Sequence, residues 1–213
     1  MQLLERVGKL SKVNRVWEGE TVLCIAGGPS VTQEIVDAAR GKCRTIVVNN
    51  SYEIAPWAEV HYFADFHWWT WHKDRPAYQA FPGQRVTIEN TGQRLNDPAI
   101  HVLRNAGSTG ISEKPDAICT GGNSGYQVMN IAFLAGAKKI LLLGYDMRFV
   151  NKRAHWHADH PTKTAEAAYK TYAARYQRAV PQLDKTGVKV LNCSPGSLIN
   201  CFPFSTVAAE LAA

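Results

Sequence analysis

Long apolar runs are missing from this sequence of 213 residues. A helix that crosses a bilayer needs about 18 to 20 consecutive apolar residues, and no segment approaches that length. The opening residues MQLLERVGKL also have no extended apolar core of the kind that a secretory signal carries. We therefore expect a protein without a membrane span.

Cysteine pairs are missing as well. The five cysteines are odd in number, and none of them forms a CxxC pair. The sequence therefore indicates neither a disulfide framework nor a cysteine zinc site. Unpaired thiols are typical of a reducing compartment, so we expect a cytoplasmic protein.

Blocks of like charge are also absent, although the formal net charge is +6. Lysine and arginine are scattered along the chain, whereas proteins that bind nucleic acid usually cluster them on one face. A small anionic ligand in a locally positive cleft explains the positive excess equally well. We do not expect a nucleic-acid partner, and the oligomeric state, including a homo-oligomer, is left open.

Hydrophobic residues make up 46% of the chain and charged residues 20%, which is ordinary for one globular domain. Apolar runs around 21–26, 44–48, 60–64, 138–143 and 188–194 alternate with helical patterns. This alternation predicts an α/β fold, with a Rossmann-like, doubly wound and mostly parallel sheet that carries helices on both faces. We assign residues 1–213 to this single domain.

Three weaker segments carry their own predictions. Apolar residues at helical spacing between Leu3 and Val13 predict a leading helix that packs on the body. Residues 73–114 contain two strand-like runs among polar loops and suggest a smaller strand-rich or irregular portion. The pattern from about Lys163 to Asp184 predicts one helix, which Gly187 ends.

A glycine turn follows the first apolar run. AGGPS brings Gly27 and Gly28, then Pro29 and Ser30, to the start of a helical pattern. Glycine lets a ligand approach the backbone closely, and a serine at a helix start can cap the helix while it contacts an anion. The turn lacks the GxGxxG and GK[ST] patterns, so it is neither the usual dinucleotide fingerprint nor a P-loop. A structural turn without a ligand is the alternative.

A second glycine-rich helix start lies in CTGGNSGYQVMNIAFLAGAKKILLLGYD. The small polar residues from Thr120 to Ser124 precede a helix that we expect to end at Gly136. The strand KKILLL follows, and Asp146 lies just beyond its carboxyl end, where open α/β sheets bind ligands. Asn50 and Asp65 follow two other predicted strands in the same way. The tryptophans at 68, 69 and 71 suit either the core or the face of a nucleobase or sugar.

Three histidines, His155, His157 and His160, lie close together with Asp159. One hypothesis is a general base in a lid loop at about 147–165, because the pKa of histidine lies near neutral pH and Asp159 has the chemistry to orient an imidazole. A metal site is the second hypothesis, although the spacing is not that of the familiar zinc helices. A plain surface loop is the third.

In order and spacing, these motifs resemble the bacterial lipooligosaccharide sialyltransferases and related Rossmann-like proteins similar to 6-hydroxymethylpterin diphosphokinase, some of them encoded by phages. The matching motifs are AGGPS, VVNN, the strand that ends at Asp65, NSG with GYD, the histidine loop and CSPGSLINCF. The resemblance covers most of the chain. It departs from the family at Gly27, where Asn is frequent, at Asp65, where the sialyltransferases tend to have Asn, and at Arg148, which lies near the position of a phosphate-binding tyrosine.

The resemblance implies a pocket for a nucleotide donor and a loop histidine that deprotonates the acceptor. We assign catalysis to His160, His157 and Arg148, because a guanidinium binds phosphate oxygens in a bidentate way. The predicted nucleotide-binding residues are Gly27, Gly28, Pro29, Ser30, Asn50, Asp65, Gly122, Asn123, Ser124, Gly125, Asp146, Ser194 and Ser197.

The sequence thus predicts a transferase that uses a nucleotide-activated sugar, with no metal and no firm cofactor. One alternative is a diphosphokinase-like enzyme that uses ATP and magnesium, with Asp65 and Asp146 as metal carboxylates. A protein that sequesters or senses a nucleotide without chemistry is the other alternative.

Overall fold

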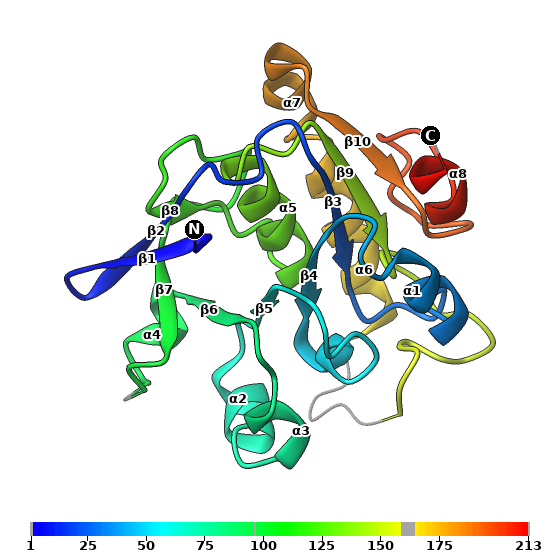
Figure 1. The fold of residues 1–213 in the computed structure, drawn as a ribbon. Helices are drawn as coiled ribbons and strands as arrows, with labels where there is room; N and C mark the ends of the chain where they lie inside the picture. Colours follow the sequence, from blue (N-terminus) through cyan, green and yellow to red (C-terminus); the bar gives the residue numbers. More distant parts are fainter. Residues whose placement is uncertain (1, 96, 159–164, 213) are drawn as a thin grey trace.

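One parallel sheet organises the chain (Figure 1). The computed structural model describes residues 2–95, 97–158 and 165–212, and within them the sheet has eight strands. Their order is β10-β9-β3-β4-β5-β6-β7-β8, and all neighbouring pairs are parallel. The strands are β3 (Thr21–Ile25), β4 (Arg44–Val48), β5 (Val60–Tyr62), β6 (Gln84–Ile88), β7 (Ile100–Asn105), β8 (Ala117–Ile118), β9 (Lys139–Leu143) and β10 (Lys189–Asn192).

Helices cover both faces of this sheet. They are α1 (Gln33–Ala39), α2 (Phe66–His72), α3 (Pro76–Gln79), α4 (Glu89–Gly92), α5 (Ser124–Leu134), α6 (Glu166–Tyr176), α7 (Val180–Thr186) and α8 (Val207–Leu211), with a short 3-10 helix η1 (Asn49–Tyr52) after β4. Each described helix falls short of the length and apolar character that a bilayer crossing requires.

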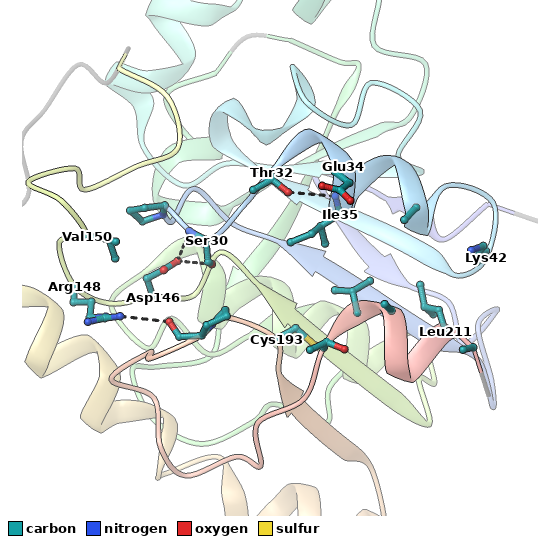
Figure 2. Close-up of a pocket in the computed structure, with 17 residues that line it drawn as sticks. Ser30, Thr32, Glu34, Ile35, Lys42, Asp146, Arg148, Val150, Cys193 and Leu211 are labelled. Carbon is teal, nitrogen blue, oxygen red and sulfur yellow. Dashed lines mark hydrogen bonds between the residues drawn. The ribbon is translucent and has the colours of Figure 1, made fainter.

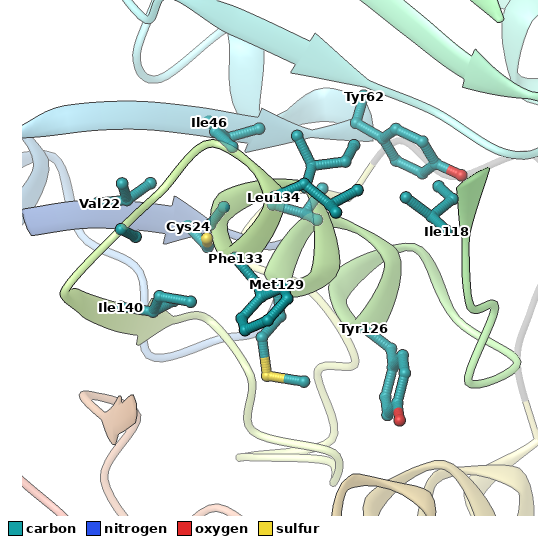
Figure 3. Packing of buried hydrophobic residues seen from close by; sticks show 14 of the residues in the cluster. Val22, Cys24, Ile46, Tyr62, Ile118, Tyr126, Met129, Phe133, Leu134 and Ile140 are labelled. Carbon is teal, nitrogen blue, oxygen red and sulfur yellow. The ribbon is translucent and has the colours of Figure 1, made fainter. Parts of the chain in front are cut away.

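The two faces of the sheet bury alternate residues of the same strands. Val22 and Cys24 of β3 face a core that α5, α6 and α7 cover, and Figure 3 shows Met129 and Phe133 of α5 in this layer. Leu23 and Ile25 alternate with these residues along β3. They face the opposite core, which α1, α2, α3 and α8 cover. Strands buried on both faces are typical of parallel sheets. The predicted α/β, Rossmann-like sheet with helices on both faces is confirmed.

The strand order reverses between β3 and β9. From β3 the chain adds β4 to β8 on one side, and α5 then returns it to β9 on the other side of β3. In open α/β sheets, ligands bind beyond the carboxyl ends of the strands at this switch point. The glycine turn follows β3 and the turn with Asp146 follows β9, so both emerge there.

The predicted leading helix is wrong. Residues Leu4–Val7 and Leu10–Val13 form a hairpin, β1 and β2, with Leu4 opposite Val13 and a turn at Gly8, whose φ is +65°. The side chain of Gln84 fixes the hairpin to the sheet, because its amide accepts from Leu4 N at 2.9 Å and donates to Leu4 O at 2.8 Å. A left-handed φ suits glycine and ends any helix at this point.

The two strand-like runs predicted within 73–114 are the strands β6 and β7, and both extend the main sheet. Another prediction needs correction. The helix expected from about Lys163 to Asp184 is divided into α6 and α7, while residues 163 and 164 lie outside the described residues. Pro181 explains the division, since its ring has no N–H and clashes with the carbonyl four residues before it in a continuous helix.

Candidate functional site

Two turns meet at the switch point. Gly28 N donates to Gly144 O at 2.8 Å, and the Ser30 hydroxyl donates to Asp146 Oδ2 at 2.8 Å (Figure 2). Ser30 N reaches the same oxygen at 3.3 Å. A Cβ at Gly28 would overlap the Asp146 carboxylate and the Gly144 carbonyl. Gly28 is therefore required for the contact between the two turns, whether or not a ligand also approaches it.

Asp146 is a buried carboxylate with one engaged oxygen. Its residue is 1% exposed, and its Oδ1 has no hydrogen-bond partner among the described residues. Burial raises the pKa of Asp146, whereas the hydrogen bonds from Ser30 and the charge of Arg148 act in the opposite direction. A buried acceptor without a donor is costly, so this oxygen is an unusual feature of the two turns.

The turn after β10 holds the Asp146 turn in position. The Ser194 hydroxyl accepts from Tyr145 N at 2.8 Å, and the Ser197 hydroxyl donates to Tyr145 O at 2.5 Å. Both serines are buried. The structure thus places these two predicted nucleotide-binding residues beneath the site, with their hydroxyls on backbone atoms of the neighbouring turn.

Arg148 lies against the same turn. Its guanidinium packs on Gly196 and makes a long hydrogen bond of 3.5 Å to Pro195 O. Its Nε is buried and has no partner among the described residues. The cation therefore has donors left over for an anion, as the sequence analysis expects of a phosphate-binding residue.

The described part of the histidine segment lies over the glycine turn. Trp156 N donates to Gly27 O at 3.0 Å. The rings of His155 and His157 stack with centroids 5.2 Å apart, and a Cβ on Gly27 would lie 3.1 Å from His155 Nδ1. His160 and Asp159 lie outside the described residues, as does part of the proposed lid at 147–165. The role of His160 stays a prediction.

The start of α5 reaches the site through Tyr145. Asn123 is the helix cap, because its Oδ1 accepts from Tyr126 N and from the Tyr176 hydroxyl, both at 3.0 Å. The Tyr145 hydroxyl donates to Gly125 O at 3.0 Å, which ties α5 to the turn that bears Asp146. Ser124 begins the helix, and Gly122 is exposed in the turn before it.

Asn50 and Asp65 are engaged by the protein itself. Asn50 is fully buried and its Oδ1 accepts from the Trp68 indole N–H at 2.8 Å. The Asp65 carboxylate caps α2 by accepting from His67 N at 2.8 Å. Trp68 is a core residue, whereas Trp71 is 44% exposed. The sequence suited the tryptophans either to the core or to the face of a nucleobase or sugar. Trp68 belongs to the core.

A cavity of about 870 Å³ opens beside the two turns and runs between α1 and α8. Pro29, Ser30, Asp146 and Arg148 line one end of it (Figure 2). Thr32 lines it too and caps α1 by accepting from Ile35 N, so Ser30 is not the cap that the sequence suggests. The cavity also has an apolar wall that no sequence motif predicts, and it includes Ile35, Ala38, Cys193, Val207, Ala208 and Leu211.

No protein-family model and no curated protein sequence matches this chain. Solved structures are similar in fold. The MAf glycosyltransferase from Magnetospirillum magneticum AMB-1 aligns with 90% of this chain at 14% identity and a TM-score of 0.56, and the chain spans 34% of that protein's length.

Two structures of the sialyltransferase CstII from Campylobacter jejuni are similar as well. The complex with the substrate analogue CMP-3FNeuAc aligns with 87% of this chain at 15% identity, and the complex with cytidine-5'-monophosphate aligns with 89% at 16% identity. The TM-scores are 0.50 and 0.51, and the chain covers 86% of CstII in each. At such identities the likeness establishes the fold, which this chain shares with these glycosyltransferases.

Proposed function

We propose that the protein is a transferase that uses a nucleotide-activated sugar, in the manner of a glycosyltransferase. The observation that carries this proposal is the crevice between the turns after β3 and β9. Unpartnered polar atoms of Asp146 and Arg148 lie there, beside a cavity of about 870 Å³. The shared fold with a sialyltransferase that was solved with a CMP-sugar analogue supports the choice of donor class.

The chemistry is a direct displacement. The acceptor oxygen attacks the anomeric carbon of the sugar while the bond from that carbon to the phosphate oxygen breaks, and the nucleotide leaves with the electron pair. Arg148 would offset the charge that develops on the leaving phosphate. His160 or His157 would take the acceptor proton as general base.

The residues predicted to bind the donor, together with Arg148, fall into three groups. Pro29, Ser30, Asp146 and Arg148 line the cavity and are proposed to contact the donor. A second group forms hydrogen bonds within the protein. Asn50 and Asp65 accept from Trp68 and His67, Asn123 accepts from Tyr126, and Ser194 and Ser197 bond to the backbone of Tyr145. Gly27, Gly28, Gly122, Ser124 and Gly125 remain predictions as donor contacts.

The diphosphokinase alternative uses Asp65 and Asp146 as magnesium carboxylates. The strands that carry them, β5 and β9, are three positions apart in the sheet. At the usual strand spacing this is about 14 Å, and each carboxylate is anchored at its own strand end. Magnesium binds its ligands at about 2 Å, so this spacing counts against a single ion that both carboxylates hold. A sequestering protein would share the pocket and differ only in turnover.

A thermal-shift screen tests the proposal. CMP, UDP, GDP, ATP and their sugar derivatives are added with and without magnesium, because a ligand that binds the folded state raises its stability. We expect one nucleotide and its sugar derivative to raise the Tm. Arg148→Ala should abolish the shift, whereas Arg153→Ala, an exposed arginine in the same segment, should keep it. A Tm that no nucleotide moves would overturn the proposal.

A further inference from the structure

The cavity between α1 and α8 has two halves of different chemistry. Its mouth is polar, with Ser30, Asp146 and Arg148 (Figure 2). Beyond the mouth its walls are mostly apolar, with Ile35 from α1, Leu211 from α8 and other aliphatic or small side chains. A volume of about 870 Å³ lies within the range of small-molecule sites, and a donor bound at the mouth does not account for an apolar groove.

The polar half requires a hydrogen-bond donor. Asp146 lines the cavity as a residue that is 1% exposed, and its Oδ1 is buried without a hydrogen-bond partner among the described residues. The neighbouring Arg148 offers donors of its own and attracts the Asp146 carboxylate electrostatically. A ligand that presents a hydroxyl at this end would donate to the Asp146 carboxylate, while Arg148 stays with the phosphate of the donor.

The apolar half is suited to a flexible chain. The groove follows α1, whose seven residues extend about 10 Å, and Figure 2 shows Lys42 at the end opposite Arg148. Ala38 and Ala208 are small residues on the two facing helices, and both are exposed. Small side chains on opposite walls leave room for a narrow apolar group, and water is displaced when such a group enters.

We propose that this groove binds the apolar chain of the acceptor, which is a single-chain amphiphile with a hydroxylated head. The head lies at Asp146 and the chain extends between α1 and α8 toward Lys42. The role of the amphiphile as acceptor rests on the proposed function. Its binding in the groove is argued from the cavity alone.

Alkyl β-D-glucosides with six, seven and eight carbons are the probes, used below their micellar concentrations. Calorimetry should show the affinity rising by about fourfold for each added methylene, because each buried methylene contributes a nearly constant free energy. Glucose alone should bind far more weakly. An affinity that does not change with chain length would overturn the proposal.

Two adjacent alanines of α8 give a matched pair of variants. Ala208 lines the groove and Ala209 does not, although both are exposed. Ala208→Phe should remove the dependence on chain length, and Ala209→Phe should keep it. Ala38→Phe blocks the groove from the other helix and decides the question if Ala208→Phe does not fold. Wild-type behaviour of both folded groove variants would contradict the proposal.

Nucleotide binding in the same variants separates the two proposals. A folded Ala208→Phe protein should keep the thermal shift with the nucleotide and lose octyl glucoside binding. If no nucleotide binds while the chain-length series still depends on Ala208, the proposed function fails and the amphiphile groove stands. If nucleotides bind and the affinity of the alkyl glucosides does not change with chain length, the groove proposal fails and the proposed function stands.

Discussion

Ser30 and Asp146 are 116 positions apart in the sequence and are joined by a hydrogen bond of 2.8 Å. The bond connects the turn after β3 with the turn after β9, the two strands that flank the switch point of the sheet. It uses one oxygen of the carboxylate, and the other oxygen is buried without a partner among the described residues. The same pair therefore supports the fold and shapes the site.

Ser30→Ala should lower the free energy of unfolding by about 1 to 3 kcal/mol, because it removes a hydrogen bond to a buried charged group. Urea denaturation measures the effect. Ser205→Ala is the control, since Ser205 donates to Glu210 Oε1 at the same 2.8 Å in a less buried setting. If the free energy of unfolding falls equally in the two variants, burial of Asp146 does not strengthen its hydrogen bond with Ser30.

The histidines should separate by their kinetics. If His160 is the base, His160→Ala should lower turnover by roughly 10² to 10⁴-fold and leave donor affinity nearly unchanged, because a general base contributes in the transition state. His157→Ala tests the other candidate in the same assay. Under the metal hypothesis, elemental analysis should instead find a stoichiometric ion that either substitution removes.

Chelation should distinguish the sugar transferase from the diphosphokinase. A leaving phosphate neutralised by Arg148 needs no metal, whereas diphosphate transfer from ATP requires magnesium to bridge phosphate oxygens. We expect activity to survive EDTA, a nucleotide monophosphate to appear from the donor, and Asp65→Asn to be tolerated better than Arg148→Ala. Loss of activity in EDTA together with AMP release from ATP would replace the proposed function with the alternative.

His61 should make the fold sensitive to acid. Burial lowers its pKa to about 3, and the ring lies among Tyr52, Phe63, Trp68 and Tyr78, with Nε2 donating to Asn49 O. The unfolded chain takes up a proton near pH 6.5 and the folded one near 3. The contribution of neutral His61 to the free energy of unfolding is therefore complete above pH 6.5. It is lost as the pH falls toward 3, by up to about 1.4 kcal/mol per pH unit.

Urea denaturation between pH 7 and pH 4 measures this dependence. His61→Gln keeps a donor for Asn49 O and should give a shallower decline in the free energy of unfolding. His67→Gln, at an exposed position of α2, is the control for loss of a histidine. Parallel declines in the wild type and His61→Gln would refute the assignment.

Much of the fold could be predicted because the strands are apolar runs that parallel sheets bury on both faces. Ser30 and Asp146 could be expected at one edge for the same reason, since each follows a strand. The hairpin at the start of the chain could not be distinguished from a helix, because Leu4 and Val13 suit either spacing. Only the turn at Gly8, with its left-handed φ, decides between them.

The rest of the site depends on contacts that no local pattern encodes. Asn50 looks like a ligand-binding residue after a strand, yet Trp68 from the next helix occupies its carbonyl oxygen. Leu211 looks like an ordinary residue of a terminal helix, and it becomes a cavity wall only because α8 packs beside α1. Such pairings arise from the order of the strands rather than from neighbouring residues.

The place of β9 beside β3 also determines when the site can form. β3 ends at Ile25 and β9 begins at Lys139, so the strand pair at the switch point joins segments that are far apart in the chain. Contacts of this kind form slowly, because a long loop must close before the pairing stabilises it. During synthesis, β3 leaves the ribosome long before its partner, and the crevice is completed only after the strands on the other side of β3 have been made.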